Sequence, residues 1–181
     1  PYEPGRPISA VRLDTGIEAV VKLASNEGPF PPFPAAMAAI AEAASGQNIY
    51  PDPGAWELRD ALERHTMVPQ ELILPGNGVD SLIKLICLAA LDPGDELVMG
   101  WPSFISWRQG ALIMGATPPL VPLAADGAYD LDAILDAITP RTKVVVVVSP
   151  NNPTGAAVSA DDLTSFLDRV PGHVLPVLDE A

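Results

Sequence analysis

Basic residues and cysteine are scarce in this sequence of 181 residues. Lysine and arginine together number 10 against 23 aspartate and glutamate residues, which gives a formal net charge of -13. Nucleic acids and anionic membranes require a basic surface, so we expect neither as a partner. The single cysteine, Cys87, cannot form a disulfide within the chain. We interpret it as a small core residue of a protein in the reducing cytoplasm.

Long apolar stretches are also missing. No segment has the length and apolar character of a membrane span, and no signal peptide is visible. Hydrophobic residues make up 48% and charged residues 18% of the chain, which is the composition of a globular protein rather than a disordered one. The length fits about one domain with an additional arm.

The first 32 residues are rich in proline and glycine and lack sustained periodicity. We expect residues 1–32 to form an extended arm, with a short strand at residues 20–23, that lies on a larger body. Residues 33–181 are expected to form the domain itself. Its first helices are predicted at residues 34–44 and 55–65 from apolar spacing and from the proline and glycine that flank them.

A regular alternation of strands and helices begins near residue 72. Strands are predicted at residues 72–74, 96–99, 118–122, 144–148 and 174–178, and helices at residues 79–91, 104–114, 130–138 and 159–170. Five consecutive valines at residues 144–148 indicate a strand buried on both faces. Ser159 is predicted to cap the last helix, with Asp162 three residues further on. The alternation predicts an α/β fold with a mostly parallel sheet covered by helices.

Three polar segments follow predicted strands, where ligands of parallel sheets bind. The first, at residues 76–80, offers backbone amides and a helix dipole to an anion, although glycine also occurs in such turns for steric reasons alone. The second, at residues 149–155, holds Asn151 and Asn152 between two prolines, which suits either rigid ligand contacts or a stiff turn. The third is Asp179, which either binds a ligand or simply ends its strand.

The second segment, Ser-Pro-Asn-Asn-Pro-Thr-Gly, resembles the signature loop of the class I and II aminotransferases, which are fold-type I enzymes that use pyridoxal phosphate (PLP). Asp-Glu-Ala at residues 179–181 resembles the family's D-E-A-Y segment. Further similar segments, in the family's order, are P-Y-E-P-G at residues 1–5, S-N-E-G-P at 25–29, Y-P-D at 50–52, G-N-G-V-D at 76–80 and P-S-F at 102–104. The sequence departs from the family pattern at Gly28, usually asparagine, at Val79, often serine, and at Ser81, often glutamate.

The resemblance implies the large domain of a fold-type I PLP enzyme, incomplete at its C-terminus, with PLP as cofactor and no metal. In the family, the aspartate at the position of Asp179 contacts the pyridine nitrogen of PLP. The other implied cofactor contacts are Gly78, Val79 and Asp80 at the phosphate, Phe104 stacked on the pyridine ring, and Asn152 at the phenolic oxygen. Tyr50 is implied to reach the cofactor of a neighbouring subunit, which makes a homodimer, and Asn26 is implied to contact the substrate.

The arm segments most resemble the histidinol-phosphate aminotransferases, which implies transamination between L-histidinol phosphate and 2-oxoglutarate in histidine biosynthesis. In the family the Schiff-base lysine follows the D-E-A-Y segment, and Lys22, Lys84 and Lys143 do not match it. We therefore expect this chain to be part of a longer enzyme and to be inactive alone. The alternatives are another PLP reaction on the same fold, such as threonine-phosphate decarboxylation, and a non-catalytic binding or dimerisation module.

Overall fold

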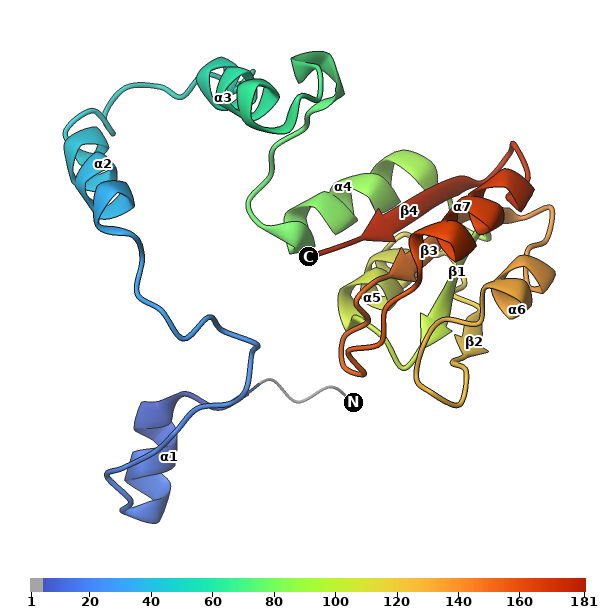
Figure 1. The fold of residues 1–181 in the computed structure, drawn as a ribbon, viewed down its shortest axis with the longest axis horizontal. Coiled ribbons are helices and arrows are strands. Elements are labelled where there is room, and N and C mark those ends of the chain that lie inside the picture. The colour runs from blue at the N-terminus through green and yellow to red at the C-terminus, as the bar shows by residue number, and fades with distance from the viewer. Residues whose placement is uncertain (1–4) are drawn as a thin grey trace. The chain divides into compact units, whose positions relative to one another are not determined.

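The computed structural model describes residues 5–181, so that residues 1–4 of the P-Y-E-P-G segment lie outside the described residues (Figure 1). The chain divides into two compact units, Pro1–Met67 and Val68–Ala181. No helix in the described part of the chain is long and apolar enough to cross a membrane.

The first unit contains three helices joined by loops: α1 (Ile8–Thr15), α2 (Pro34–Ala44) and α3 (Trp56–Thr66). The helices predicted at residues 34–44 and 55–65 are confirmed, and α1 lies within the segment expected to be an extended arm. The strand predicted at residues 20–23 is wrong, because no strand among the described residues pairs with that segment. None of these three helices contains a buried residue, so they form no core of their own.

The Y-P-D segment forms the turn that starts α3. The Asp52 carboxylate accepts hydrogen bonds from the backbone amides of Trp56 at 2.8 Å and Gly54 at 2.9 Å. These bonds, that from Trp56 first, hold the pKa of Asp52 below its ordinary value because they favour the carboxylate. Asp52 thereby satisfies an amide of the first turn of α3, which has no partner within the helix.

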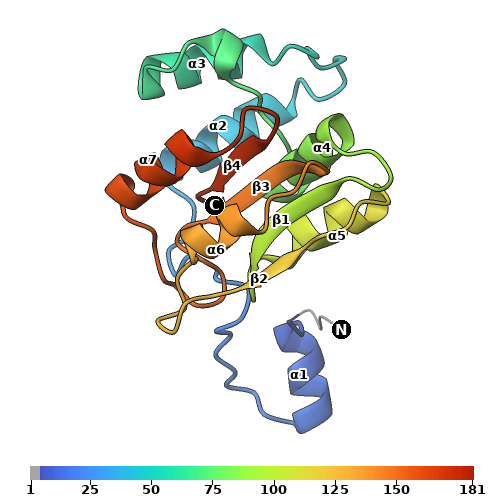
Figure 2. The same ribbon diagram turned by 90° about the vertical axis from the view of Figure 1, so that its right-hand side faces the viewer.

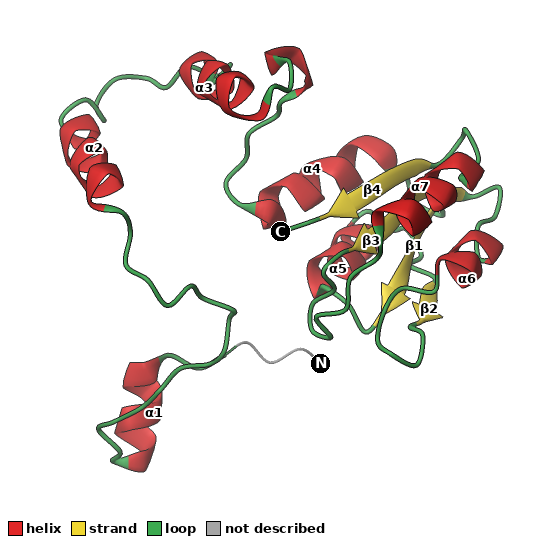
Figure 3. Ribbon diagram, in the orientation of Figure 1, coloured by secondary structure: helices red, strands yellow, loops and turns green. Residues whose placement is uncertain are grey.

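A four-stranded parallel sheet forms the centre of the second unit (Figure 3). Its strands are β1 (Glu96–Trp101), β2 (Leu120–Pro122), β3 (Thr142–Val148) and β4 (Leu175–Asp179), arranged in the order β2-β1-β3-β4. All five valines at residues 144–148 are buried. The predicted α/β fold with a parallel sheet is therefore confirmed.

Helices cover both faces of the sheet (Figure 2). On one face α4 (Val79–Ala90) packs against α5 (Ile105–Ile113), and on the other α6 (Leu131–Asp136) packs against α7 (Ala160–Arg169). Ser159 caps α7 as predicted, because its hydroxyl accepts a 3.1 Å hydrogen bond from the Asp162 amide. The core between these layers includes Ile83, Trp107, Ile134 and Phe166.

The strand predicted at residues 72–74 is wrong. Gln70–Leu72 forms a short 3-10 helix, η1, and residues 73–76 are irregular. Leu72 and Leu74 are 73% and 70% exposed. A strand requires hydrogen bonds from a neighbouring strand, and none of the four strands of the described sheet pairs with this apolar segment.

The strand order creates a topological switch point between β1 and β3. From β1 the chain crosses to β2 on one side and then returns to β3 on the other side of β1. Loops that leave the carboxyl ends of strands at such a point diverge and form a crevice for ligands. In this sheet these loops are residues 102–104 after β1 and residues 149–155 after β3.

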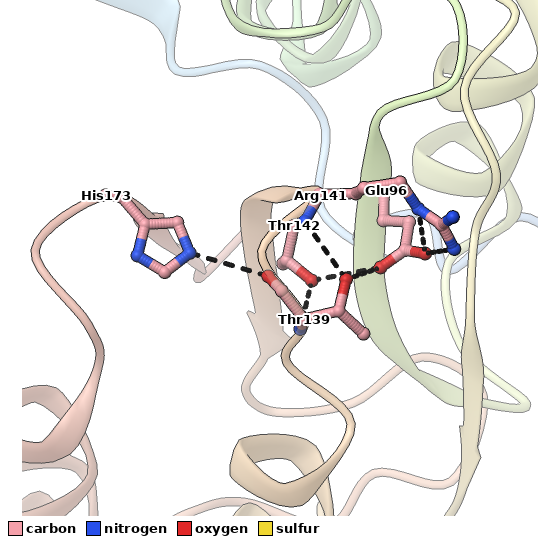
Figure 4. A network of polar contacts seen from close by, with 5 residues as sticks. All are labelled: Glu96, Thr139, Arg141, Thr142 and His173. Carbon is pink, nitrogen blue, oxygen red and sulfur yellow. Dashed lines mark hydrogen bonds and ion pairs between the residues drawn. The ribbon is translucent and has the colours of Figure 1, made fainter.

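A polar network surrounds Glu96 at the opposite end of the sheet (Figure 4). The Glu96 carboxylate is 4% exposed and accepts hydrogen bonds from Thr139 Oγ1 at 2.5 Å, Arg141 Nη2 at 2.6 Å and Thr142 Oγ1 at 3.2 Å. These bonds, that from Thr139 first and then that from Arg141, lower the pKa of Glu96. His173 Nε2 lies 3.4 Å from the Thr139 carbonyl oxygen. The network lies at the amino ends of the strands, so we assign it to the stability of the sheet.

Candidate cofactor site

Asp179 is a buried carboxylate at the carboxyl end of the sheet. It ends β4 and is 6% exposed. Its Oδ2 accepts a 2.7 Å hydrogen bond from the indole Nε1 of Trp107, and its Oδ1 accepts a 3.1 Å bond from the Ala181 amide. None of the ion pairs within the described part of the chain includes Asp179. A buried carboxylate is costly without a cationic partner, so this position favours a positively charged group of a ligand.

A chain of buried hydrogen bonds joins the loops on the two sides of the switch point. The Tyr129 hydroxyl donates to Ser103 Oγ at 2.8 Å, and Ser103 Oγ donates to Asn151 Oδ1 at 2.7 Å. Asn151 Nδ2 donates to the Pro102 carbonyl oxygen at 3.1 Å and to Thr154 Oγ1 at 2.9 Å. Burial raises the pKa of Tyr129, so its hydroxyl remains a donor at neutral pH. These bonds fix the two loops relative to each other.

The two adjacent asparagines have different surroundings. Asn151 is 2% exposed, and its side chain is used within the chain of buried hydrogen bonds. Its backbone also closes the loop, because its amide donates to the Ala156 carbonyl at 2.8 Å and its carbonyl accepts from the Gly155 amide at 2.7 Å. Asn152 is exposed on this braced loop. The arrangement therefore leaves Asn152 as the asparagine that can reach a ligand.

The N-terminus of α4 is the candidate anion site. Gly78 precedes the helix with a φ of 73°, in the left-handed region that favours glycine. No side chain caps α4, and the Ser81 hydroxyl instead donates to the Gly78 carbonyl at 2.9 Å. The backbone amides of Val79 and Asp80 begin the helix, where amides lack partners within the helix and the dipole favours an anion. A phosphate group matches this arrangement.

The segment after β1 carries two aromatic residues, Phe104 and Trp107. Phe104 immediately precedes α5, is half-buried, and packs against the core. Its backbone is extended (φ -61°, ψ 115°), and Trp107 lies three residues later in the first turn of α5. The start of α5 therefore carries both aromatic residues.

Tyr50 and Asn26 belong to the first unit, whereas the other predicted site residues belong to the second. Tyr50 is 89% exposed. Asn26 is exposed as well and has a φ of 51°, in the left-handed region that asparagine tolerates better than most residues.

Sequence reasoning missed Trp107, Ser103, Tyr129 and the structural role of Asn151. The spacing of three residues between Phe104 and Trp107 at a helix start is a signal that could have pointed to Trp107. Tyr129 lies far along the chain, in the loop before α6, and has no local signal that links it to Ser103. Within the described residues, no group of three or more histidine, cysteine, aspartate or glutamate side chains could hold a metal ion.

The strand order and the loops at the switch point define a class of fold. The solved structure of histidinol-phosphate aminotransferase from Sinorhizobium meliloti in complex with pyridoxal-5'-phosphate matches with a TM-score of 0.90 at 28% identity, covering 99% of this chain and 49% of that one. N-succinyldiaminopimelate aminotransferase from Mycobacterium tuberculosis matches with a TM-score of 0.81 at 31% identity, covering 95% of this chain and 47% of that one. The fold is therefore that of the large domain of fold-type I aminotransferases, as predicted.

The chain belongs to the class I and II aminotransferase family, because the family described as "Aminotransferase class I and II" matches residues 18–181. Histidinol-phosphate aminotransferase from Bacillus velezensis is 45% identical over 181 residues, which cover 100% of this chain and 50% of that protein. The protein of the same name from Bacillus subtilis strain 168 is 44% identical, with 100% and 50% covered. The chain thus spans about half the length of the curated relatives it matches.

Proposed function

We propose that the protein containing this chain is a PLP-dependent aminotransferase and that the carboxyl edge of the sheet holds one side of the cofactor. The observation that carries the proposal is Asp179, a buried carboxylate without a cationic side-chain partner among the described residues. A protonated pyridine nitrogen is the kind of partner that such a carboxylate needs. When bound, PLP supplies an electron sink for the substrate, and the Asp179 carboxylate keeps the ring nitrogen protonated.

Other residues of the second unit suit the remaining groups of PLP. The first amides of α4, after Gly78, would bind the phosphate through Val79 and Asp80. Phe104 would stack on the pyridine ring, and it lacks the hydroxyl that a tyrosine would add. Asn152 would donate its side-chain amide to the phenolic oxygen. The contacts of Asn151 support this assignment, because they brace the loop that carries Asn152.

We further propose L-histidinol phosphate as the amino donor and 2-oxoglutarate as the acceptor, in histidine biosynthesis. The support is the identity of 45% and 44% to relatives named histidinol-phosphate aminotransferase. The test uses the protein expressed from its complete gene and loaded with PLP. We expect glutamate to form in a one-to-one ratio with the histidinol phosphate consumed. Release of carbon dioxide from an amino-acid phosphate without 2-oxoglutarate would contradict the proposal, as would PLP binding without either reaction.

We also propose a homodimer in the cytoplasm, in which Tyr50 of one subunit contacts the cofactor of the other. The high exposure of Tyr50 within its own unit, 89%, supports a contact made outside that unit. Asn26, in the same unit, would contact the substrate. Size-exclusion chromatography with light scattering tests the assembly, and a monomer that retains full activity would contradict it.

A further inference from the structure

We propose that Trp107 is a positioning residue for the cofactor, which acts through Asp179 rather than by touching PLP. This inference rests on the proposed function, because it concerns the carboxylate that would hold the pyridine nitrogen. Its basis is the 2.7 Å hydrogen bond from Trp107 Nε1 to Asp179 Oδ2, which joins residues 72 positions apart in the sequence.

The indole of Trp107 is fixed in place by the core. It is 1% exposed and lies in the first turn of α5, which packs against α4 and contacts β1. A buried indole N–H needs an acceptor, and a charged acceptor gives a short and strong hydrogen bond. The acceptor in this structure is the Asp179 carboxylate. The donor is therefore rigid, and the acceptor takes its orientation from the donor.

The Asp179 carboxylate needs such a constraint. It ends β4, a strand at the edge of the described sheet, and the second χ angle of aspartate has a broad energy profile. With Oδ2 held by the indole at 2.7 Å and Oδ1 by the Ala181 amide at 3.1 Å, rotation of the carboxylate is limited, and its remaining lone pairs can accept a further donor. The indole bond also stabilises the negative charge of the carboxylate. The carboxylate would then present a fixed, negatively charged acceptor to the N–H group of a pyridine ring.

The position of Trp107 couples this constraint to the stacking ring. Phe104 is the N-cap residue of α5, and Trp107 lies three residues later in the first turn of the helix. A shift of α5 would therefore move the ring that stacks on PLP and the donor that orients Asp179 together. The start of α5 would thus position the pyridine ring in two ways: Phe104 would contact its face, and Trp107 would orient the Asp179 carboxylate that contacts its nitrogen.

The test removes the indole N–H and keeps the shape of the side chain. Benzothienylalanine, in which sulfur replaces the N–H group, is incorporated at position 107 of the protein expressed from its complete gene. PLP labelled with an NMR-active nitrogen isotope in the pyridine ring is then bound. We expect its nitrogen resonance to move toward that of neutral pyridine and PLP affinity to fall about tenfold, as for the loss of a hydrogen bond to a charged group.

Three substitutions serve as controls. Trp107→Tyr, compared with Trp107→Phe, restores an O–H donor and is expected to recover part of the shift in the nitrogen resonance. Trp56→Phe changes a tryptophan in α3 that is 61% exposed and is expected to leave both readings unchanged.

An unchanged nitrogen resonance and unchanged PLP affinity in the benzothienylalanine protein would overturn the inference and reduce Trp107 to a packing residue. Loss of PLP binding at an unchanged melting temperature of the apo protein would support it. Failure of the unsubstituted protein to bind PLP would instead overturn the proposed function itself, so the two failures are distinguishable.

Discussion

The hydroxyl of Ser103 donates a 2.7 Å hydrogen bond to the side-chain oxygen of Asn151 across the switch point between β1 and β3. Both residues are buried, at 6% and 2% exposure. Their bond links the loop that carries Phe104 to the loop that carries Asn152. Two side chains proposed to touch PLP are thus positioned by a pair of residues that need not touch it.

Ser103→Ala tests this link. The substitution leaves a buried amide oxygen and the Tyr129 hydroxyl without their partner, so we expect the free energy of unfolding to fall by about 1–3 kcal/mol. PLP affinity should fall as well, because the two loops are no longer joined. Urea denaturation and PLP titration of the full-length protein measure the two effects. Ser165→Ala, at an exposed position of α7, should change neither; equal behaviour of the two variants would contradict the role of Ser103.

The lowered pKa of Glu96 predicts how the free energy of unfolding changes in acid. Hydrogen bonds from Thr139 and then Arg141 lower its pKa in the folded state. The stabilisation is therefore complete above the unfolded-state value of about 4.3 and is lost as the pH falls through the lowered folded-state pKa. At neutral pH, Glu96→Gln should cost about 1.5–3 kcal/mol of unfolding free energy.

The pH dependence separates this effect from a general loss of packing. Unfolding free energies of the wild type and of Glu96→Gln, measured by urea denaturation, should converge as the medium becomes acidic. Glu71→Gln, at an exposed position, should follow the wild type throughout. A constant difference between the wild type and Glu96→Gln from neutral pH to strong acid would show that charge at Glu96 is irrelevant.

Helices α4 and α5 approach each other closely at Gly110, which predicts that a larger side chain there is destabilising. A Cβ atom at Gly110 would lie 2.7 Å from the Sγ atom of Cys87. Gly110→Ala should therefore cost about 1–3 kcal/mol by overpacking. Cys87→Ala removes that sulfur, so the double variant should lose less than the sum of the two single losses. Additive losses in thermal denaturation would mean that the helices separate freely at this contact.

The proposed contact of Tyr50 with the neighbouring cofactor predicts that each active site combines Asp179 of one subunit with Tyr50 of the other. If Tyr50 acts on the cofactor of its neighbour, Tyr50→Ala and Asp179→Ala should each reduce transamination strongly. Subunits of the two variants, unfolded together and refolded, would form mixed dimers with one intact site. Activity should then recover to about a quarter of that of the wild type, as expected for random pairing in a twofold dimer. If the refolded mixture stays as inactive as the two single variants, Tyr50 does not complete the site of the neighbouring subunit, and the proposed contact is contradicted.

The central sheet could be predicted because its signals are local. Consecutive valines, the Ser159 cap and turns rich in glycine and proline each indicate one element, and their alternation indicates the fold. The segment at residues 72–74 has the apolar pattern of a strand, but pairing depends on a neighbour that local sequence cannot specify. The strand predicted at residues 20–23 fails for the same reason.

The sequence predicted part of the candidate site in two steps: the alternation of strands and helices placed Asn152 and Asp179 at the carboxyl ends of strands, and the resemblance to a known family implied their contacts with the cofactor. That resemblance pointed to Asp179 and Asn152, which lie at the expected edge. The contacts that brace them come from Trp107 and Tyr129, which are distant in sequence and individually unremarkable as core aromatic residues. Trp107 has a local signal in its spacing from Phe104, whereas the contact of Tyr129 follows from tertiary packing, so only the structure could identify it.

PLP binding by Asp179→Asn tests the account most directly. The full-length apo protein is titrated with PLP, and binding is followed by the visible absorbance of the cofactor. The account predicts saturable binding by the wild type, binding at least about tenfold weaker by Asp179→Asn, and wild-type binding by Glu180→Gln, which alters the adjacent exposed carboxylate. Equal PLP affinity of Asp179→Asn and the wild type would contradict the assignment of this sheet edge as the cofactor site.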